Sequence, residues 1–461
     1  MLINPPWISK KETRLLKLHS LTPPLGLCYI AAVLEKNSID VEILDAAVLN
    51  LTVEETVEHV TKKNSDVVGI TATTPLAFSA IETLKKIKTA LPKTITVFGG
   101  PHINAIPYET MKSYPFIDIG VLGEGEYAML DIASGVPLKK IRGIIYRKEK
   151  EIIVNEKREF IKNLDSLPFP ARHLLPDLKF YKLSPSDYER LPVTTMITSR
   201  GCPFNCIFCN KQVFGRFYRS MSAERVIDEI KHLMKNYGIK EVKIWDDIFT
   251  LEKERTEKIC DIIIKEKMDI TWSCESRVDL VTKSMLLKMK KAGCWCIDYG
   301  IESASQKILD FARKGITISQ IEKAIKWTKE VGIKVRGYFV IGLPGDTERT
   351  IRKTIDFSKK LDLDYVTFFI MTPFPGTDLY SLAEKLGHVT SKNWRDYYTL
   401  SEKKVVFVPK GISKEKLERL YTQAYHEFYF RPSYILKTIL SIRSMRDVKR
   451  IVSGGLTFLL S

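Results

Sequence analysis

Short apolar runs alternate with amphipathic stretches along the first 135 or so residues. The runs that read as strands cover residues 41–44, 66–70, 94–98 and 117–121. The stretches with helical spacing cover residues 26–36, 53–63 and 75–90. Strands and helices that alternate at this pitch indicate a parallel sheet with helices on both faces. The pattern therefore predicts a doubly wound α/β domain over residues 1–135.

Residues 136–190 differ from this pattern and are predicted to form a linker. Residues 141–147 and 151–155 alternate apolar and polar positions around Lys148-Glu149-Lys150, which predicts a hairpin. The proline-rich run at 167–172 then interrupts regular structure.

Strand and helix signals alternate again from residue 191 to residue 385. The strand candidates are 193–198, 241–245, 270–274, 296–299, 334–341 and 365–370. Six strands with intervening helices predict a second parallel sheet, in which functional groups gather at the strand C-termini. Polar residues follow several strands there, among them Asp246-Asp247 and Glu275-Ser276-Arg277. Residues 386–461 are predicted to form a mostly helical C-terminal domain.

Length and composition fit two or three globular domains. The chain has 461 residues, of which 44% are hydrophobic, and no stretch reaches the ~20 apolar residues that a membrane span needs. The start, Met1 to Pro6, lacks the basic and apolar segments of a signal peptide. Eight cysteines in such a chain favour a reducing cytoplasm and metal binding over disulfides. We therefore expect a cytoplasmic protein.

Basic residues are in excess, with a formal charge of +17. This charge favours anionic partners, although a Lys-rich proteome explains it equally well. The tail from residue 401 carries 12 Lys and Arg against 5 Asp and Glu, and its aromatics cluster between Tyr421 and Phe430. The tail could lie on an anionic membrane surface or cover a barrel mouth, and we favour the second reading.

Three cysteines in one short segment carry the strongest chemical signal. Cys202, Cys206 and Cys209 follow the spacing C-x3-C-x2-C. Three thiolates this close can hold three irons of a [4Fe–4S] cluster and leave the fourth iron open to a small molecule. A zinc knuckle would need a fourth ligand, and the nearest histidine is His232. Cys294-Trp295-Cys296 could supply ligands for a second cluster. Because this segment begins a predicted strand, one of the two cysteines should face the core, which favours packing over metal binding.

The cysteine segment, Ser199 to Cys209, resembles that of radical S-adenosylmethionine (SAM) enzymes. The resemblance implies a partial (β/α)6 barrel over residues 191–385 whose open iron binds SAM. One electron then cleaves SAM to methionine and a 5′-deoxyadenosyl radical. It also implies that Phe208 packs near the adenine, that Glu302 contacts SAM and that Gly342 passes near the adenine. Arg277 is placed for the SAM carboxylate, with a buried ion pair as the alternative.

The N-terminal half resembles the cobalamin-binding domain that precedes many radical SAM domains. The matching pieces are Pro23 to Leu27, Gly99 to His102 and Leu122 to Glu126. The expected cobalamin contacts are Thr73, Thr74, Gly99, Gly100, His102, Gly123 and Glu124. The cobalt-ligating D-x-H-x-x-G segment of the methionine-synthase type does not occur in this sequence. We therefore expect His102 to lie near the corrin without binding cobalt.

Together the resemblances imply methylation of an unactivated carbon in a small-molecule or lipid-like substrate. One SAM would methylate cobalt, and another would supply the radical that abstracts hydrogen. An electron donor of the flavodoxin or ferredoxin type is expected. Oxidative cyclisation without methyl transfer is the alternative. RNA modification is disfavoured, because the sequence shows neither an RNA-binding appendage nor a second cysteine triad.

Overall fold

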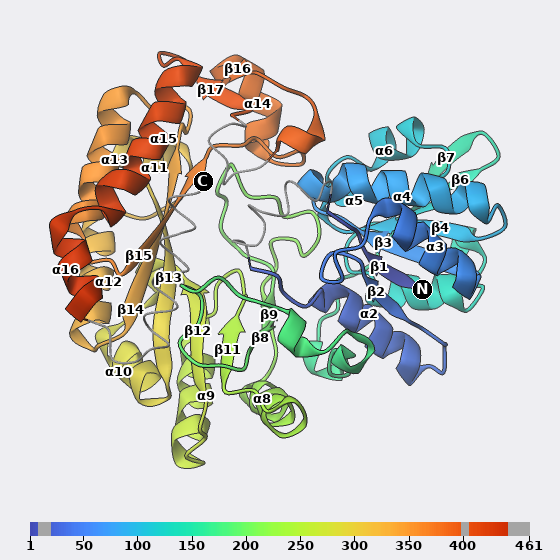
Figure 1. Cartoon of the computed structure of the whole chain (residues 1–461), viewed down its shortest axis with the longest axis horizontal. Helices are drawn as coiled ribbons and strands as arrows, with labels where there is room; N and C mark the ends of the chain where they lie inside the picture. Colours follow the sequence, from blue (N-terminus) through green and yellow to red (C-terminus); the bar gives the residue numbers. More distant parts are fainter. Residues whose placement is uncertain (8–19, 398–404, 441–461) are drawn as a thin grey trace.

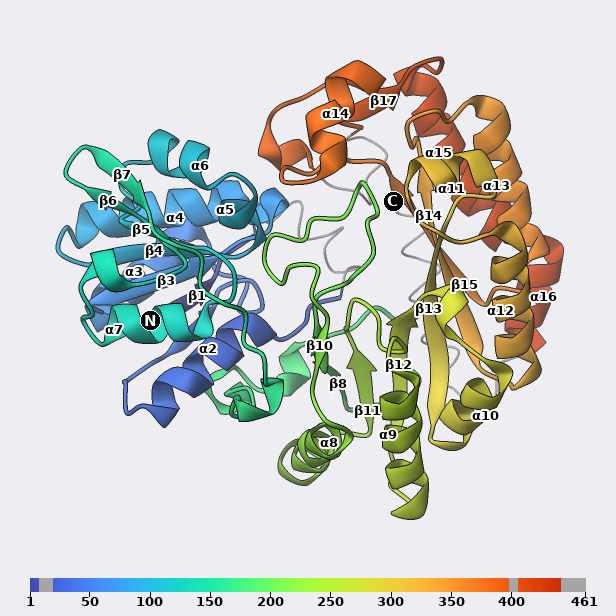
Figure 2. The same cartoon turned by 180° about the vertical axis from the view of Figure 1, so that it is seen from behind.

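The computed structural model describes residues 1–7, 20–397 and 405–440. Two large sheets dominate the fold, one N-terminal and one central (Figure 1). Seen from behind, the two domains lie side by side, and loops that follow the first strand of the central sheet run between them (Figure 2). The predicted fold class, two successive α/β domains with a helical C-terminal part, is confirmed.

The N-terminal sheet has seven strands in the order β2-β1-β3-β4-β5-β6-β7. They are β1 (Leu2–Asn4), β2 (Ile43–Asp45), β3 (Val67–Thr71), β4 (Ile95–Gly99), β5 (Ile119–Val121), β6 (Ile144–Lys148) and β7 (Glu151–Val154). The first five are parallel, and β6 and β7 are antiparallel.

Helices cover both faces of this sheet. They are α2 (Leu25–Lys36), α3 (Val53–Lys63), α4 (Ala77–Ala90), α5 (Pro101–Ala105), α6 (Pro107–Ser113) and α7 (Glu126–Ala133). Successive residues of a strand face opposite sides, so Leu2 packs with α2 and α7 while Ile3 packs with α3 and α4. Thr52 begins α3 with a capping box that pairs its side chain and backbone with Glu55.

Two parts of this sheet differ from the sequence prediction. Leu2–Asn4 forms an interior strand, β1, next to the edge strand β2, and this short segment before two prolines did not reveal it in the sequence. The hairpin assigned to the linker, β6 and β7, continues the sheet because β6 pairs with β5. The sheet therefore extends into the range that the sequence assigned to the linker.

The central sheet has six parallel strands in the order β15-β14-β13-β12-β11-β8. They are β8 (Val193–Met196), β11 (Glu241–Ile244), β12 (Thr271–Ser276), β13 (Cys294–Glu302), β14 (Lys334–Ile341) and β15 (Tyr365–Ile370). The intervening helices are α8 (Ala223–Tyr237), α9 (Lys253–Lys265), α10 (Lys283–Lys291), α11 (Gln306–Phe311), α12 (Ile318–Glu330) and α13 (Glu348–Lys360). The sheet curves into the predicted half-barrel with its helices outside (Figure 1).

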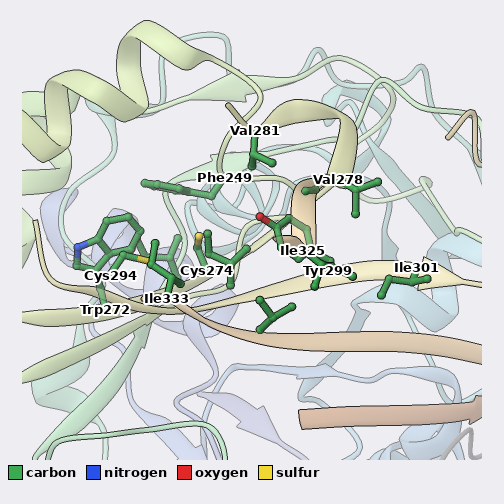
Figure 3. Close-up of a cluster of buried hydrophobic side chains, with 14 of the residues drawn as sticks. Phe249, Trp272, Cys274, Val278, Val281, Cys294, Tyr299, Ile301, Ile325 and Ile333 are labelled. Atoms are coloured by element: carbon green, nitrogen blue, oxygen red, sulfur yellow. The ribbon is translucent and has the colours of Figure 1, made fainter. Parts of the chain in front are cut away.

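Alternate strand residues separate the two faces of the half-barrel. Trp272, Cys274 and Tyr299 belong to the apolar core shared with the helices (Figure 3). Their neighbours in sequence face the concave side instead. Cys294 is also in this core, whereas Cys296 is buried outside the core cluster with its Sγ 3.5 Å from Asp298 Oδ1, so one of the two packs in the core as predicted. All eight cysteines are free.

The C-terminal part packs on the open edge of the half-barrel. It contains α14 (Asp378–Leu386), β16 (Gly387–Val389), β17 (Phe407–Pro409), α15 (Lys414–Tyr429) and α16 (Pro432–Leu440). The hydroxyl of Tyr425 accepts from Phe368 N at 3.1 Å and donates to Phe368 O at 3.0 Å. Tyr429 makes the same pair of bonds to Val366, at 3.0 and 2.8 Å.

These tyrosines pair with the backbone of edge strand β15. The membrane reading of the aromatic cluster is therefore wrong for Tyr421, Tyr425, Phe428 and Tyr429, which pack against the half-barrel core. The apolar chain end at 456–460 and the basic residues after 440 lie outside the described residues. In the described ranges, no helix is both long and apolar enough to cross a bilayer.

Candidate functional site

The three motif cysteines lie on a loop at the C-terminal end of β8. Two short antiparallel strands, β9 (Ser199–Arg200) and β10 (Arg219–Ser220), close the base of this loop. Gly201 begins it with φ +85, and a Cβ there would lie 2.4 Å from Phe217 O, so the turn requires glycine. The loop thus starts in a fixed direction, directly above the half-barrel.

Backbone bonds fix the middle of the loop. Ile207 N donates to Ala312 O at 3.1 Å, and Ile207 O accepts from Leu379 N at 2.9 Å. The next residue, Phe208, is half-buried against an apolar cluster that includes Leu343. The segment between Cys206 and Cys209 is therefore held from two sides.

One of the three thiols is predisposed to ionise. Contact with the Cys209 thiol lowers the pKa of Cys206 to about 6, with help from the Lys314 ammonium, whereas the same contact raises the pKa of Cys209 and burial raises that of Cys202. Thiolates are the form that binds iron. Among the described residues, no three His, Cys, Asp or Glu side chains already stand in metal-binding geometry.

Glu302 lies at the end of β13, within electrostatic reach of Cys206 and Cys209. Its carboxylate accepts from Lys314 Nζ at 2.6 Å, and both side chains are buried. A strand irregularity between Gly300 and Glu302 places Glu302 at φ +66. A left-handed glutamate costs on the order of 1–2 kcal/mol. Strain of this kind concentrates at functional sites, which fits the predicted role of Glu302.

Arg277 follows β12 and is buried among three partners. It pairs with both Asp279 oxygens, at 3.0 and 3.1 Å, and donates to Lys314 O at 2.8 Å. Its guanidinium lies 3.6 Å from the ring centre of Phe204, in the cysteine loop. The ion-pair alternative is therefore present in the structure, and the predicted contact with the SAM carboxylate stays a prediction.

Gly342 forms the turn after β14. Its N–H and that of Leu343 donate to Asp346, at 3.1 and 3.0 Å. Gly342 has φ +86, and a Cβ there would lie 3.1 Å from Leu417 of α15. Glycine therefore lets α15 approach this strand end, which gives the residue a packing role beside its predicted one near the adenine.

A cavity of about 130 Å³ lies at the C-terminal edge of the N-terminal sheet. Four predicted cobalamin contacts line it: Gly99, Gly100, Gly123 and Glu124. Tyr29, Arg200 and Phe214 line it from other segments. A cavity of this size can hold a benzene-sized ring, so it has room for one part of a cobalamin.

The other three predicted cobalamin contacts are not among the lining residues of this cavity. Thr73 is exposed, and Thr74 lies 3.3 Å from His102 Nδ1. His102 is fully buried, with its ring edge-on to Trp394, and burial lowers its pKa to about 4. Among the residues that the structure describes, none forms a hydrogen bond with His102 Nε2. Its placement near the corrin stays a prediction.

A buried ionic cluster joins the cavity to the cysteine loop. Glu124 accepts from Arg200 at 2.7 Å, from Arg219 at 2.8 and 2.9 Å, and from Ile161 N at 2.7 Å. Arg200 also donates to Glu126 at 2.6 Å. We call Glu124, Glu126, Arg200 and Arg219 the interdomain clamp. All four side chains are at most 5% exposed, so the clamp fixes one domain to the other.

Comparisons with known proteins agree with this geometry. Residues 12–133 match the family model of the B12 binding domain, and residues 196–358 match that of the radical SAM superfamily. An uncharacterized methyltransferase of Pyrococcus horikoshii is 38% identical over 94% of this chain and 93% of its own length. The chain belongs to the cobalamin-binding radical SAM enzymes. Its cofactors are a [4Fe–4S] cluster, SAM and cobalamin.

Two further proteins are similar to this radical SAM enzyme. The anaerobic magnesium-protoporphyrin IX monomethyl ester cyclase of Rubrivivax gelatinosus is 30% identical over 78% of this chain and 66% of its own length. The structure of the radical SAM methyltransferase TsrM from Kitasatospora setae, with cobalamin and a [4Fe–4S] cluster bound, has a TM-score of 0.71. It is 17% identical and covers 94% of this chain and 89% of that one, which shows a shared fold.

Sequence reasoning found the cysteines but missed their surroundings. The structure brings Glu302 and Arg277 to the cysteine loop as expected. It adds Lys314, which pairs with Glu302 and whose backbone holds Arg277. It also adds the arginines of the interdomain clamp. Arg200 stands directly before the Gly-Cys of the motif, so its position could have drawn attention.

Proposed function

We propose that this enzyme is a cobalamin-dependent C-methyltransferase acting on an unactivated carbon of a small-molecule or lipid-like substrate. The observation that carries the proposal is the near full-length likeness to a relative named as a methyltransferase, 38% identical over 93% of that protein. The likeness spans both domains, so it covers the two cofactor sites and the linker between them.

The residues of the chain have definable tasks in such a reaction. Cys202, Cys206 and Cys209 would hold the cluster, and the cavity beside Gly99 would take part of the cobalamin. When bound, these groups supply SAM cleavage and methyl transfer. Lys314 neutralises Glu302 next to the thiols, and both are buried. The protein therefore supplies a dry site with a fixed distance between its cofactors.

The interdomain clamp supports a two-cofactor reaction. Arg200 and Arg219 flank the cysteine loop, whereas Glu124 and Glu126 follow β5 of the cobalamin domain. Their ion pairs tie the loop that would carry SAM directly to the edge that would carry cobalamin. Groups that must react in sequence need such a fixed geometry.

Anaerobic turnover with methyl-labelled SAM and extracts of the source cell tests the proposal. We expect label in a small metabolite or lipid, together with S-adenosylhomocysteine and 5′-deoxyadenosine in about equal amounts. The triple replacement of Cys202, Cys206 and Cys209 by Ala should remove the brown chromophore and nearly all SAM cleavage. Full SAM cleavage with no label outside SAM and its own products would contradict methyl transfer.

Oxidative cyclisation is the second candidate, favoured by the cyclase of Rubrivivax gelatinosus. The same experiment separates the two reactions. A cyclase would release 5′-deoxyadenosine in step with a ring-closed product and would form no S-adenosylhomocysteine.

The proposed reaction also implies partners. We propose a flavodoxin or ferredoxin as electron donor. The test is whether either protein replaces dithionite in SAM cleavage.

We also propose weak membrane contact for the tail. The test is flotation with acidic liposomes at low and high salt, compared with a variant that ends at Phe430. Equal flotation of both proteins would overturn it. An absorbance ratio at 260 and 280 nm that shows bound nucleic acid would revive RNA as substrate.

A further inference from the structure

The concave face of the half-barrel carries side chains that the proposed reaction has not yet used. Along β14 and β15 half-exposed residues alternate with buried ones. The half-exposed set faces away from the helices, because the buried set lies in their shared core. Tyr338, Val340, Thr367 and Phe369 belong to the half-exposed set.

Aromatic rings line this face. Tyr338 and Phe369 stand 5.7 Å apart between ring centres, tilted by 60°. On the other side of the face, Trp245 directly follows β11 and is also half-exposed. Aromatic rings that stay partly open at the concave side of a barrel offer stacking surfaces to a flat ligand.

The charged side chains next to the aromatic rings of the concave face balance each other in charge. Lys243 donates to Asp298 at 2.9 Å and to Asp187 at 3.1 Å. Arg336 pairs with Asp187 at 2.8 Å. The two cations are therefore matched by two carboxylates, and all four side chains are at most 15% exposed. These four side chains together carry no net charge.

Glu275 is a further carboxylate on this face, and no cation of this balanced set is left to pair with it. It lies on β12, level with Asp298 in the strand register, and its backbone neighbour Cys274 points into the helical core. Within the described chain its carboxylate forms no hydrogen bond or salt bridge. The Lys243 ammonium lies within electrostatic reach of Glu275, but the salt bridges of Lys243 go to Asp187 and Asp298.

We propose that the concave face binds a planar substrate that carries a protonated amine, with Glu275 as the counter-ion of that amine. Tyr338 and Phe369 would stack on the flat part of the substrate. A carboxylate that is unpaired and partly removed from water gains most from a cationic partner. This local preference for a cation runs against the chain's overall charge of +17. The inference rests on the proposed function, because it names the substrate class of the same site.

The test uses the anaerobically reconstituted full-length enzyme, saturated with S-adenosylhomocysteine, in equilibrium dialysis at physiological salt and at pH 8, where the Glu275 carboxylate is ionised. The probes are tryptamine, a flat cation, and indole-3-propionate, a flat anion of similar size. We expect wild type to retain tryptamine at least tenfold more strongly. Glu275→Gln should remove most of this preference, and Glu322→Gln, on the exposed side of α12, should keep it.

Three results would overturn the inference. They are equal retention of the two probes by wild type, an unchanged preference in Glu275→Gln with normal iron content, and weaker S-adenosylhomocysteine binding in that variant. The last result would place Glu275 in the SAM site. Should Glu275→Gln fail to bind iron, the wild-type preference between probes still decides. SAM cleavage by wild type, measured in parallel, tests the proposed function separately, since cleavage does not depend on either probe.

Discussion

Glu124→Gln should weaken the junction between the two domains more than any surface change. In the wild type the clamp holds two cations and two carboxylates, so its net charge is zero. The variant leaves Arg200 and Arg219 facing Glu126 alone, with one buried positive charge unmatched. Breaking a buried ion pair costs about 3–5 kcal/mol. Glutamine keeps one acceptor oxygen, so we expect the lower end, about 3 kcal/mol.

Urea unfolding of the anaerobic protein measures this loss. With a slope of about 3 kcal/mol per molar urea, the midpoint of the transition should fall by about 1 M. The matched control is Glu322→Gln, which removes a carboxylate at the surface and should shift the midpoint very little. We also expect Glu124→Gln to bind less iron, since Arg200 and Arg219 form the base of the cysteine loop.

A second substitution isolates the charge effect. Arg219→Met added to Glu124→Gln returns the clamp to neutrality, with Arg200 still paired to Glu126. The double variant should therefore lose less free energy of unfolding than the two single variants lose together, by about 1–3 kcal/mol. A coupling below about 0.5 kcal/mol, or a Glu124→Gln midpoint equal to that of Glu322→Gln, would refute the reasoning.

Three more predictions follow from single contacts. Tyr429→Phe should speed hydrogen exchange at the Val366 amide and cost about 1–3 kcal/mol, because that N–H loses its acceptor; unchanged exchange would contradict this. Burial raises the pKa of Glu275 from 4.5 to about 7, so the folded state holds this proton more tightly than the unfolded state does. Stability should fall from pH 5 to pH 8 by up to about 3 kcal/mol relative to Glu275→Gln, as thermal melts across pH would show. Lys314→Met should lower the melting temperature and abolish SAM cleavage, because Glu302 loses its buried partner; a variant that cleaves SAM normally would rule this out.

The strands and the cluster cysteines could be predicted because their signals are local. Runs such as Lys334–Ile341 combine β-branched and aromatic residues over a whole strand, and the C-x3-C-x2-C spacing needs eight residues. β1 could not be predicted because three residues carry too little pattern. Its place inside the sheet, one strand from the edge, comes from pairing with β2 and β3 on either side.

The surroundings of the site depend on pairs that are distant in sequence. Arg200 and Glu124 are 76 residues apart, and Arg219 and Glu124 are 95 apart. Glu124 was predicted as a cobalamin contact, and Arg200 stands beside the cysteine motif, but nothing in one sequence links the two residues to each other. The tail aromatics differ, because Tyr421, Tyr425 and Tyr429 recur every four residues and so mark one helical face. That spacing predicts that the rings share one surface, and the contacts of Tyr425 and Tyr429 with β15 show which partner this surface has.

The two tyrosine contacts on β15 limit how far one helix can cover the edge of this sheet. Four residues of a helix rise about 6.0 Å, whereas two residues of a strand rise about 6.6 Å. Tyr425 and Tyr429 can therefore meet Phe368 and Val366 together, but each further step would add about 0.6 Å of mismatch. Helix α15 therefore serves two positions of the strand edge, and at the third, Asp364 O accepts from Tyr434 of α16, after α15 has ended. One residue inserted between the tyrosines would turn the second hydroxyl by about 100° and reopen the edge.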